Sequence, residues 1–318
     1  MTRASRSLIA VIGLWFAVIA PVAAQEEAVI TPDARPYSLT VGVREWISQG
    51  RSAHNIGGTT NVASELSWRG LNIPITQVHA DLVVLNRLVG NVEIGYGSRS
   101  HGTLLDQDWS GNNRTDKFSE TLSDVSGGSV LTISLTTGLR LLAWNVQDNP
   151  VLGGVDALVG YQYWRERYEA SGVQNLLTGA SSFNGVTALT QTNTWNSIRI
   201  GTRATVPILS RVALTGSVFY IPYTAYRNED IHHLRSDLRK DPSFLSEANG
   251  GSGIQLEASV AVRVWQRLTA EVGYAYWDIR SGQGTIQAFN ANGSVAFGTH
   301  NEDNTRRQGI FFGVNWIF

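Results

Sequence analysis

From about residue 37 onward, apolar and polar residues alternate along the chain with a period of two. In segment 129–143, Leu131, Ile133 and Leu135 alternate with threonine and serine, and segments 253–265 and 268–277 have the same pattern. A period of two is that of a β-strand whose two faces meet different surroundings. The sequence therefore predicts an all-β protein.

The alternating segments are long, and their polar face carries charges in mid-strand, such as Glu257 and Arg263. Strands of a soluble sandwich are shorter, about five to six residues. Long alternating strands are typical of an outer-membrane barrel, in which apolar residues face lipid and polar residues face the lumen. We predict ten antiparallel strands, at 37–48, 62–85, 88–102, 128–145, 151–171, 186–206, 212–227, 252–265, 268–281 and 305–318.

The connections between these strands alternate in length. Short turns fall near 86–87, 147–150, 207–210 and 266–267, and long polar loops are expected at 49–61, 103–127, 172–185, 228–251 and 282–304. Short periplasmic turns and long extracellular loops are expected of outer-membrane barrels. Aromatic residues near the strand ends are expected to form two interfacial girdles. They are Trp144, Trp265 and Trp316 on the short-turn side, and Trp46, Trp68, Tyr226 and Trp277 on the long-loop side.

The first residues have the pattern of an export signal. Arg3 and Arg6 precede an apolar run at 8–20, and small residues follow up to Ala24. This order predicts a secretory signal peptide at 1–24, cleaved after Ala24, with a barrel domain at 25–318. A membrane anchor is the alternative, but the apolar run is short for a span of about 20 residues. No later stretch has the run of about 18 apolar residues that a transmembrane helix needs.

Composition narrows the chemistry. The chain has no cysteine, so disulfides, thiolate metal sites and a cysteine nucleophile are excluded. Its formal net charge is −1 and basic clusters are absent, so nucleic acid is not an expected partner. We expect a monomer in the outer membrane, with outer-membrane lipid as a partner and no covalently bound cofactor.

Two acidic stretches are candidates for catalysis. Asp106 and Asp108 lie in the second predicted long loop, and Asp230 and His232 lie at the start of the fourth. In extended chain, residues two apart point to the same face, so each pair can present both side chains to the lumen mouth. In such a site, Asp230 would hold one nitrogen of His232, and the other nitrogen would take a proton from water. The neighbouring carboxylates should favour the protonated imidazole, and two close aspartates should titrate as a coupled pair.

Other interpretations of these residues stay open. An Asp-x-Asp string in a loop is commonly a solvated turn. The same four side chains can supply oxygen and imidazole ligands to a cation, although no EF-hand spacing is present and we predict no metal site. A serine hydrolase is disfavoured because no Gly-x-Ser-x-Gly elbow occurs. His233 adjoins the pair but should face away from Asp230, and the remaining histidines are expected to be ordinary lumen or loop residues.

Several strings resemble the omptins, outer-membrane endopeptidases built as ten-stranded barrels. The strings are Leu105-Asp106-Gln107-Asp108-Trp109, Asp230-Ile231-His232, Ser64-Glu65-Leu66-Ser67-Trp68 and Gly160-Tyr161-Gln162. The resemblance covers essentially the whole mature chain. It implies an omptin-type aspartyl endopeptidase with polypeptides as its partners and substrates. Asp106, Asp108, Asp230 and His232 would be the catalytic set, and water would be the nucleophile.

The sequence also departs from the omptin pattern. Omptins that cut beside basic residues carry two acids in the substrate pocket, but Asn228 occupies one of these positions and segment 48–55 contains no acid. Asn228 and its neighbour Glu229 are therefore the candidate substrate-binding residues, and Glu229 is expected to compensate for the missing acid. Tyr161 and Arg165 match part of the family's lipopolysaccharide-binding motif, so the resemblance implies a requirement for lipopolysaccharide.

Two competing functions remain. A non-catalytic barrel, an adhesin or a surface-binding protein, would have the same strands but would not need the four residues. A channel is less expected, because side chains fill a barrel of this size. A lipid deacylase would place serine and histidine at the lipid face. The natural substrate and the cleavage preference do not follow from the sequence.

Overall fold

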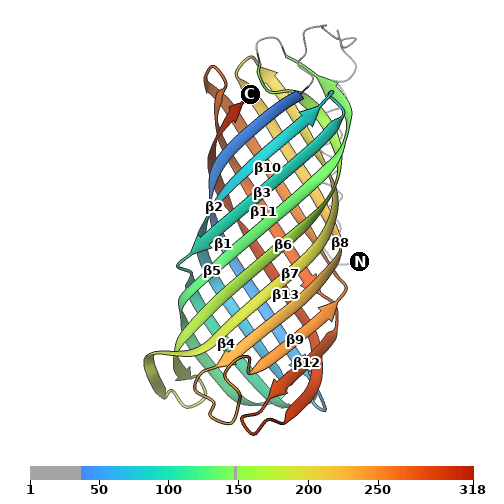
Figure 1. Cartoon of the computed structure of the whole chain (residues 1–318). Coiled ribbons are helices and arrows are strands. Elements are labelled where there is room, and N and C mark those ends of the chain that lie inside the picture. The colour runs from blue at the N-terminus through green and yellow to red at the C-terminus, as the bar shows by residue number, and fades with distance from the viewer. Residues whose placement is uncertain (1–36, 147–148) are drawn as a thin grey trace. The chain divides into compact units, whose positions relative to one another are not determined.

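The computed structural model describes residues 37–146 and 149–318, so the predicted signal peptide lies outside the described residues. Those residues form one antiparallel sheet closed into a barrel (Figure 1). Its strands are β1 (Tyr37–Gly57), β2 (Ser64–Val84), β3 (Leu88–Ser98), β4 (His101–Gly111), β5 (Thr115–Trp144), β6 (Gly153–Asn175), β7 (Ser181–Leu209), β8 (Val212–His232), β9 (Phe244–Asn249), β10 (Gly251–Trp265), β11 (Leu268–Ser281), β12 (Gly284–Phe289) and β13 (Val295–Ile317). A 3₁₀ turn, η1 (Asn112–Arg114), joins β4 to β5.

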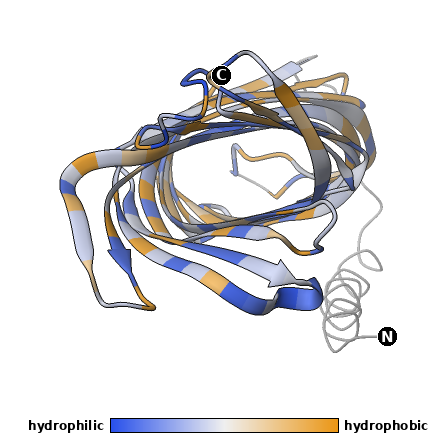
Figure 2. Ribbon diagram, turned by 90° about the horizontal axis from the view of Figure 1, so that it is seen from below, coloured by the Kyte–Doolittle hydropathy of each residue, from blue (hydrophilic) through white to orange (hydrophobic). Residues whose placement is uncertain are grey.

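The ring closes where β1 pairs with β13, from Thr40 opposite Ile317 to Gly57 opposite Thr299. Closure leaves no unpaired edge in the ring of described strands, which is the condition for crossing a bilayer with strands. The short strands β4, β9 and β12 continue β3, β10 and β11 beyond breaks in the chain, so the described strands occupy the ten predicted positions. Figure 2 looks along the barrel and shows the strands surrounding a lumen. No helix among the described residues has the length and apolar character needed to cross a membrane.

The alternation along each strand separates the lipid face from the lumen face. On β5, Ile133 and Leu135 are exposed, whereas Thr132 and Ser134 between them are buried. The same band of exposed apolar residues continues on β1, where Val41, Val43 and Ile47 point outward. Since about ten residues of a tilted strand cross a bilayer, strands of 21 to 30 residues extend well beyond it on the long-loop side.

We expect a charge placed in this band to destabilise the barrel. Val43 is 41% exposed and lies opposite two other outward valines, Val78 and Val314. Val43→Arg should lower the free energy of unfolding by about 2–4 kcal/mol, the cost of a cation near the bilayer midplane. Gln49→Arg, on the same face of β1 but above the band, should cost less than about 1 kcal/mol. Urea unfolding in lipid vesicles measures both, and equal costs would contradict the assigned band.

The predicted long loops are largely strand, which corrects the sequence prediction. Loop 103–127 contains most of β4 and the first part of β5, and loops 228–251 and 282–304 contain β9 and β12. The apolar alternation stops where each strand leaves the lipid. Backbone pairing does not stop there, since it requires no apolar side chain. Asp106 and Asp108 therefore lie on a paired strand and not in a loop.

The long-loop aromatic girdle was also predicted wrongly. Trp46, Trp68, Tyr226 and Trp277 are all buried inside the barrel. Trp164 stacks on Trp277 with ring centroids 4.3 Å apart, and Trp46 and Trp195 meet this pair edge-on. The cluster draws residues from strands all around the ring, so it forms an aromatic layer across the lumen. Outward aromatic residues do occur, among them Tyr96, Tyr161, Tyr223 and Tyr274.

A buried ion pair lies beside this aromatic layer. The Nη2 atom of Arg307 lies 2.9 Å from Oε1 of Glu166, and neither side chain is exposed to solvent. The guanidinium also donates to the Tyr168 hydroxyl and to the Leu71 carbonyl oxygen. Together with the aromatic layer, this pair separates the long-loop half of the lumen from the short-turn half. Side chains therefore fill the middle of the lumen.

Candidate active site

The aspartate pair lies on β4, above the lipid band. Asp106 pairs with Leu66 of β2 and Thr121 of β5, and Asp108 lies two residues further along the same face. Leu104, the preceding residue on that face, is buried in an apolar cluster inside the barrel. The alternation thus turns both carboxylates toward the lumen mouth, as predicted, and both are half-buried.

Asp230 and His232 lie at the end of β8, three ring positions beyond β5. Asp230 is opposite Gln191 of β7, and His232 is opposite Leu189. Leu189 belongs to the same apolar cluster as Leu104, so the end of β8 and the aspartate pair both lie next to this cluster. Segments separated by more than 100 residues in sequence meet at this rim.

The charges at the rim are coupled. Burial, together with the negative charges of Asp108 and Asp230, raises the pKa of Asp106 to about 7. Burial also raises the pKa of Asp230, against the opposing effects of His54 and of the Asn228 amide. Like charges held close in a poorly solvated site favour the protonated acid. Asp106 therefore keeps its proton in a substantial fraction of molecules near neutral pH.

His232 has a different environment from the one predicted. Its ring meets Phe244 edge-on, with centroids 5.0 Å apart, and no hydrogen bond among the described residues joins it to Asp230. Asp230 instead accepts a hydrogen bond from the Asn228 amide at 3.1 Å. Burial lowers the pKa of His232 to about 4, and the nearby cations Arg235 and Lys240 contribute to this. We expected neighbouring carboxylates to favour the imidazolium, but burial and these cations have the larger effect.

The segment after β8 positions His232 through its backbone. The Lys240 ammonium donates to the carbonyl oxygens of His232, His233 and Arg235, at 2.6 to 3.1 Å. The Ser243 hydroxyl accepts from the His232 amide and donates to the Arg239 carbonyl oxygen. His233 lies within 2.9 Å of the Thr190 hydroxyl and is not engaged with Asp230, as expected. The backbone at His232 is thus held on two sides, while its ring meets Phe244 edge-on.

The two predicted substrate-binding residues lie on opposite faces of β8. Asn228 is fully buried on the lumen face, where its amide nitrogen donates to Asp230 and to Asn193. Glu229 points outward and pairs with Arg227 at 2.7 Å. Since it is directed away from the cleft, Glu229 cannot compensate there for the missing acid, and that part of the prediction is corrected.

A buried polar network beneath Asp230 was not predicted as part of the site. His54 and Asp303 are both buried, with Nδ1 of His54 3.7 Å from Oδ2 of Asp303. The Tyr226 hydroxyl donates to the Asp303 carboxylate at 2.9 Å, and His300 stacks on His54. The charge of His54 lowers the pKa of Asp230. Continuing the β1 alternation past Ser48 would have placed His54 in the lumen, so the sequence did indicate the position of this histidine.

The residues implied in lipopolysaccharide binding lie elsewhere. Tyr161 and Arg165 are exposed on the outer face of β6, and the Tyr161 hydroxyl donates to the Asn196 side chain. In the part of the chain that the structure describes, no group of three or more histidine, aspartate or glutamate side chains is arranged to hold a metal ion.

Comparison with known proteins places the chain in a family. The model of the Protochlamydia outer membrane protein family, Pom, matches residues 39–318. The chain belongs to the Pom family. No curated protein matches it. An outer-membrane location, predicted from the strand pattern, is thereby confirmed.

Solved structures show which barrel the Pom chain resembles. The outer membrane protease OmpT from Escherichia coli superposes with a TM-score of 0.72 at 14% identity, covering 91% of this chain and 99% of that chain. The translocator domain of the autotransporter NalP from Neisseria meningitidis gives 0.33 at 11% identity, covering 98% and 97%. A FadL homologue from Pseudomonas aeruginosa gives 0.27 at 8%, covering 88% and 90%. The likeness to OmpT confirms the omptin-like barrel; at this identity it establishes the fold alone.

Proposed function

We propose that this Pom-family barrel is an outer-membrane endopeptidase. The catalytic water would lie between the carboxylates of Asp106 and Asp108 on β4 and the side chains of Asp230 and His232 on β8. One observation supports this above the others: Asp230 on β8 lies near enough to the pair on β4 that its charge, added to burial and to the charge of Asp108, raises the pKa of Asp106. Perturbed carboxylates facing one another in a cleft are typical of catalytic sites.

The chemistry proceeds without a covalent intermediate. The oxygen of water attacks the peptide carbonyl while the water proton passes to His232, which is neutral above pH values near 4. Protonated Asp106 donates a hydrogen bond to the carbonyl oxygen as negative charge develops there. The C–N bond then breaks, and the proton held by His232 passes to the leaving amine. His232 must turn from Phe244 toward Asp230 for this step, so the contact with Phe244 is the resting position.

Polypeptide is the proposed substrate, and its preference should not be limited to basic residues. The buried Asn228 places a neutral amide beside Asp230, where a carboxylate would favour arginine or lysine. We further propose that lipopolysaccharide binds the outer face of β6 near Tyr161 and Arg165 and supports activity.

A peptide-library digestion tests the proposal. Refolded protein is compared with its Asp106→Asn, Asp108→Asn double variant, each with and without lipopolysaccharide. Cleavage by the wild type that the double variant lacks, at sites not restricted to arginine and lysine, is the expected result. The absence of cleavage by a wild-type barrel shown to be folded would refute the peptidase.

The pKa values predict the pH dependence of cleavage. Activity should rise as pH passes about 4, where His232 loses its proton, and fall as pH passes about 7, where Asp106 loses its proton. Asp108→Asn removes one negative charge beside Asp106, so the pKa of Asp106 should fall and the basic limb should move to lower pH. Profiles of kcat/KM against pH for both proteins measure this, and a basic limb that does not move would contradict the role given to Asp106.

A non-catalytic surface-binding barrel is the second candidate. The absence of an Asp230–His232 hydrogen bond among the described residues favours it, as do exposed phenylalanines on the long-loop side, Phe118, Phe183 and Phe297. The same digestion separates the two candidates, since a binding barrel would not cut peptides at any pH.

A further inference from the structure

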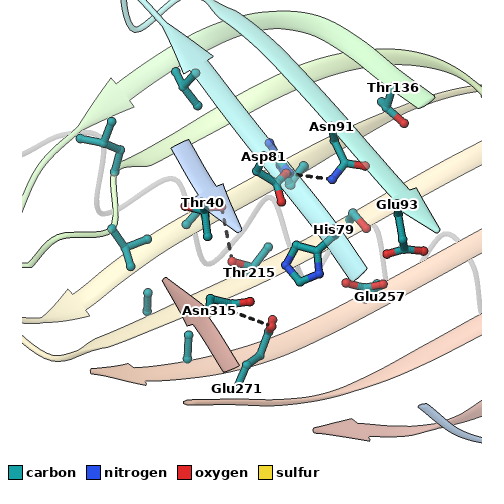
Figure 3. Close-up of a pocket in the computed structure, with 18 of the residues that line it drawn as sticks. Thr40, His79, Asp81, Asn91, Glu93, Thr136, Thr215, Glu257, Glu271 and Asn315 are labelled. Carbon is teal, nitrogen blue, oxygen red and sulfur yellow. Dashed lines mark hydrogen bonds and ion pairs between the residues drawn. The ribbon is translucent and has the colours of Figure 1, made fainter. Parts of the chain in front are cut away.

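A second polar cavity lies in the short-turn half of the barrel, below the aromatic layer (Figure 3). Its volume is about 220 Å³, whereas one water molecule needs roughly 10–15 Å³. Side chains from strands around the whole ring line it, and Pro150, Val151 and Leu152 line its end at the short turn between β5 and β6. The cavity has no part in the proposed cleavage site, which lies on the other side of the aromatic layer.

Most charges in this half of the barrel are paired within the chain. Arg44 contacts Glu93 at 2.7 Å and Glu257 at 2.8 Å. Arg203 contacts Asp81 and Asp156, and Arg140 also contacts Asp156. Buried ions are paired as a rule because desolvating a lone charge is costly. Two charged side chains on the cavity wall depart from this rule.

The first exception is Arg199 on β7, which is only 4% exposed. Its guanidinium donates to the neutral oxygens of Gln255 and Thr136, at 2.8 and 2.6 Å, and lies over the Phe219 ring. Among the described residues, no carboxylate lies within ion-pair distance of it, and its Nε atom has no hydrogen-bond partner. The cavity wall at Arg199 therefore carries a buried cation without a carboxylate at ion-pair distance.

The second exception is Glu271 on β11, which lies three ring positions from β7. Its carboxylate accepts one hydrogen bond, from the Asn315 amide at 3.1 Å, and no cation in the described part of the chain lies within ion-pair distance. Figure 3 shows Glu271 and Asn315 beside His79, whose buried Nδ1 atom also lacks a partner. This wall therefore presents an anion without a cation at ion-pair distance among the described residues.

We propose that this cavity binds a small zwitterion, an α-amino acid or a very short peptide. Its carboxylate would pair with Arg199, and its ammonium would pair with Glu271. A carboxylate and a guanidinium form strong charge-assisted hydrogen bonds. An anion alone would leave Glu271 unpaired, and a cation alone would leave Arg199 unpaired, so the zwitterion is the ligand that satisfies both walls.

Calorimetry on the folded barrel in detergent tests the proposal. The probes are glycine, alanine and dialanine, with acetate, methylammonium and chloride as single-charge controls. We expect a zwitterion to bind at least tenfold more tightly than any control. Arg199→Gln and Glu271→Gln should each weaken zwitterion binding at least tenfold, whereas Arg211→Gln, at an exposed turn, should not change it.

Thermal denaturation gives an independent readout. Zwitterion should raise the midpoint of the wild-type barrel and leave that of Arg199→Gln unchanged. A folded wild type that binds no zwitterion, or binds it no better than acetate, would overturn the proposal. Because the measurement is of binding and uses no peptide cleavage, its failure is distinct from a failure of the proposed peptidase.

Discussion

Replacing Asp106 by asparagine is expected to lower kcat for peptide cleavage by about 10²–10³-fold, with a smaller change in KM. The substitution keeps the shape of the side chain but removes the acidic proton that the site holds up to about pH 7. Loss of one preorganised donor to a developing oxyanion costs a factor of this size. Steady-state cleavage of a peptide found in the library digestion measures it.

Further substitution at the rim should add little to this loss. Residues that act as one catalytic unit are strongly non-additive, so the Asp106→Asn, Asp108→Asn double variant should be slower than Asp106→Asn by far less than the product of the single effects. Glu229→Gln is the matched control, since Glu229 is on the same rim but points outward to Arg227. It should keep activity within about twofold of wild type. An Asp106→Asn protein as active as that control would remove Asp106 from the mechanism.

The fold was predictable because its main signal is local. Burial along β5 follows the predicted alternation, with Thr132 inside and Ile133 outside. The alternation of inward and outward positions also contradicts the predicted aromatic girdle. Val43 and Ile47 point to lipid, so Trp46 between them must point to the lumen. A position near a strand end does not show which face of the strand an aromatic residue occupies, so the prediction from position missed the interior aromatic layer.

The surroundings of the site were less predictable because they depend on contacts distant in sequence. Alternation correctly turned Asp230 and His232 to one face of β8. It gave no information on Phe244, which contacts the His232 ring, or on Lys240, which holds the following turn. The extension of β4 and β5 above the lipid was not predicted because this part of each strand lacks an apolar face. The alternation that indicates a strand is therefore missing there. Charged pairs across the lumen, such as Arg307 with Glu166, join strands that are not neighbours, and no pattern within one strand predicts them.

The largest effect on stability is expected from that buried pair. Glu166→Gln leaves the Arg307 guanidinium charged, fully buried and without its carboxylate, beside only neutral acceptors. Removing one partner of a buried ion pair costs about 3–5 kcal/mol. Glu169→Gln, two residues along the same strand, breaks the exposed pair with Arg167 and should cost at most about 1 kcal/mol. Urea unfolding in lipid vesicles measures both.

The cost should come from the unpaired charge and not from loss of the pair itself. An apolar double variant, Arg307→Met with Glu166→Leu, removes both charges and keeps similar volumes, so it should recover most of the stability lost in Glu166→Gln. If the double variant were less stable than Glu166→Gln, the pair and its bonds to Tyr168 and Leu71 would themselves be the net source of stability. In that case the polar contacts, more than the aromatic layer, would stabilise the middle of the barrel.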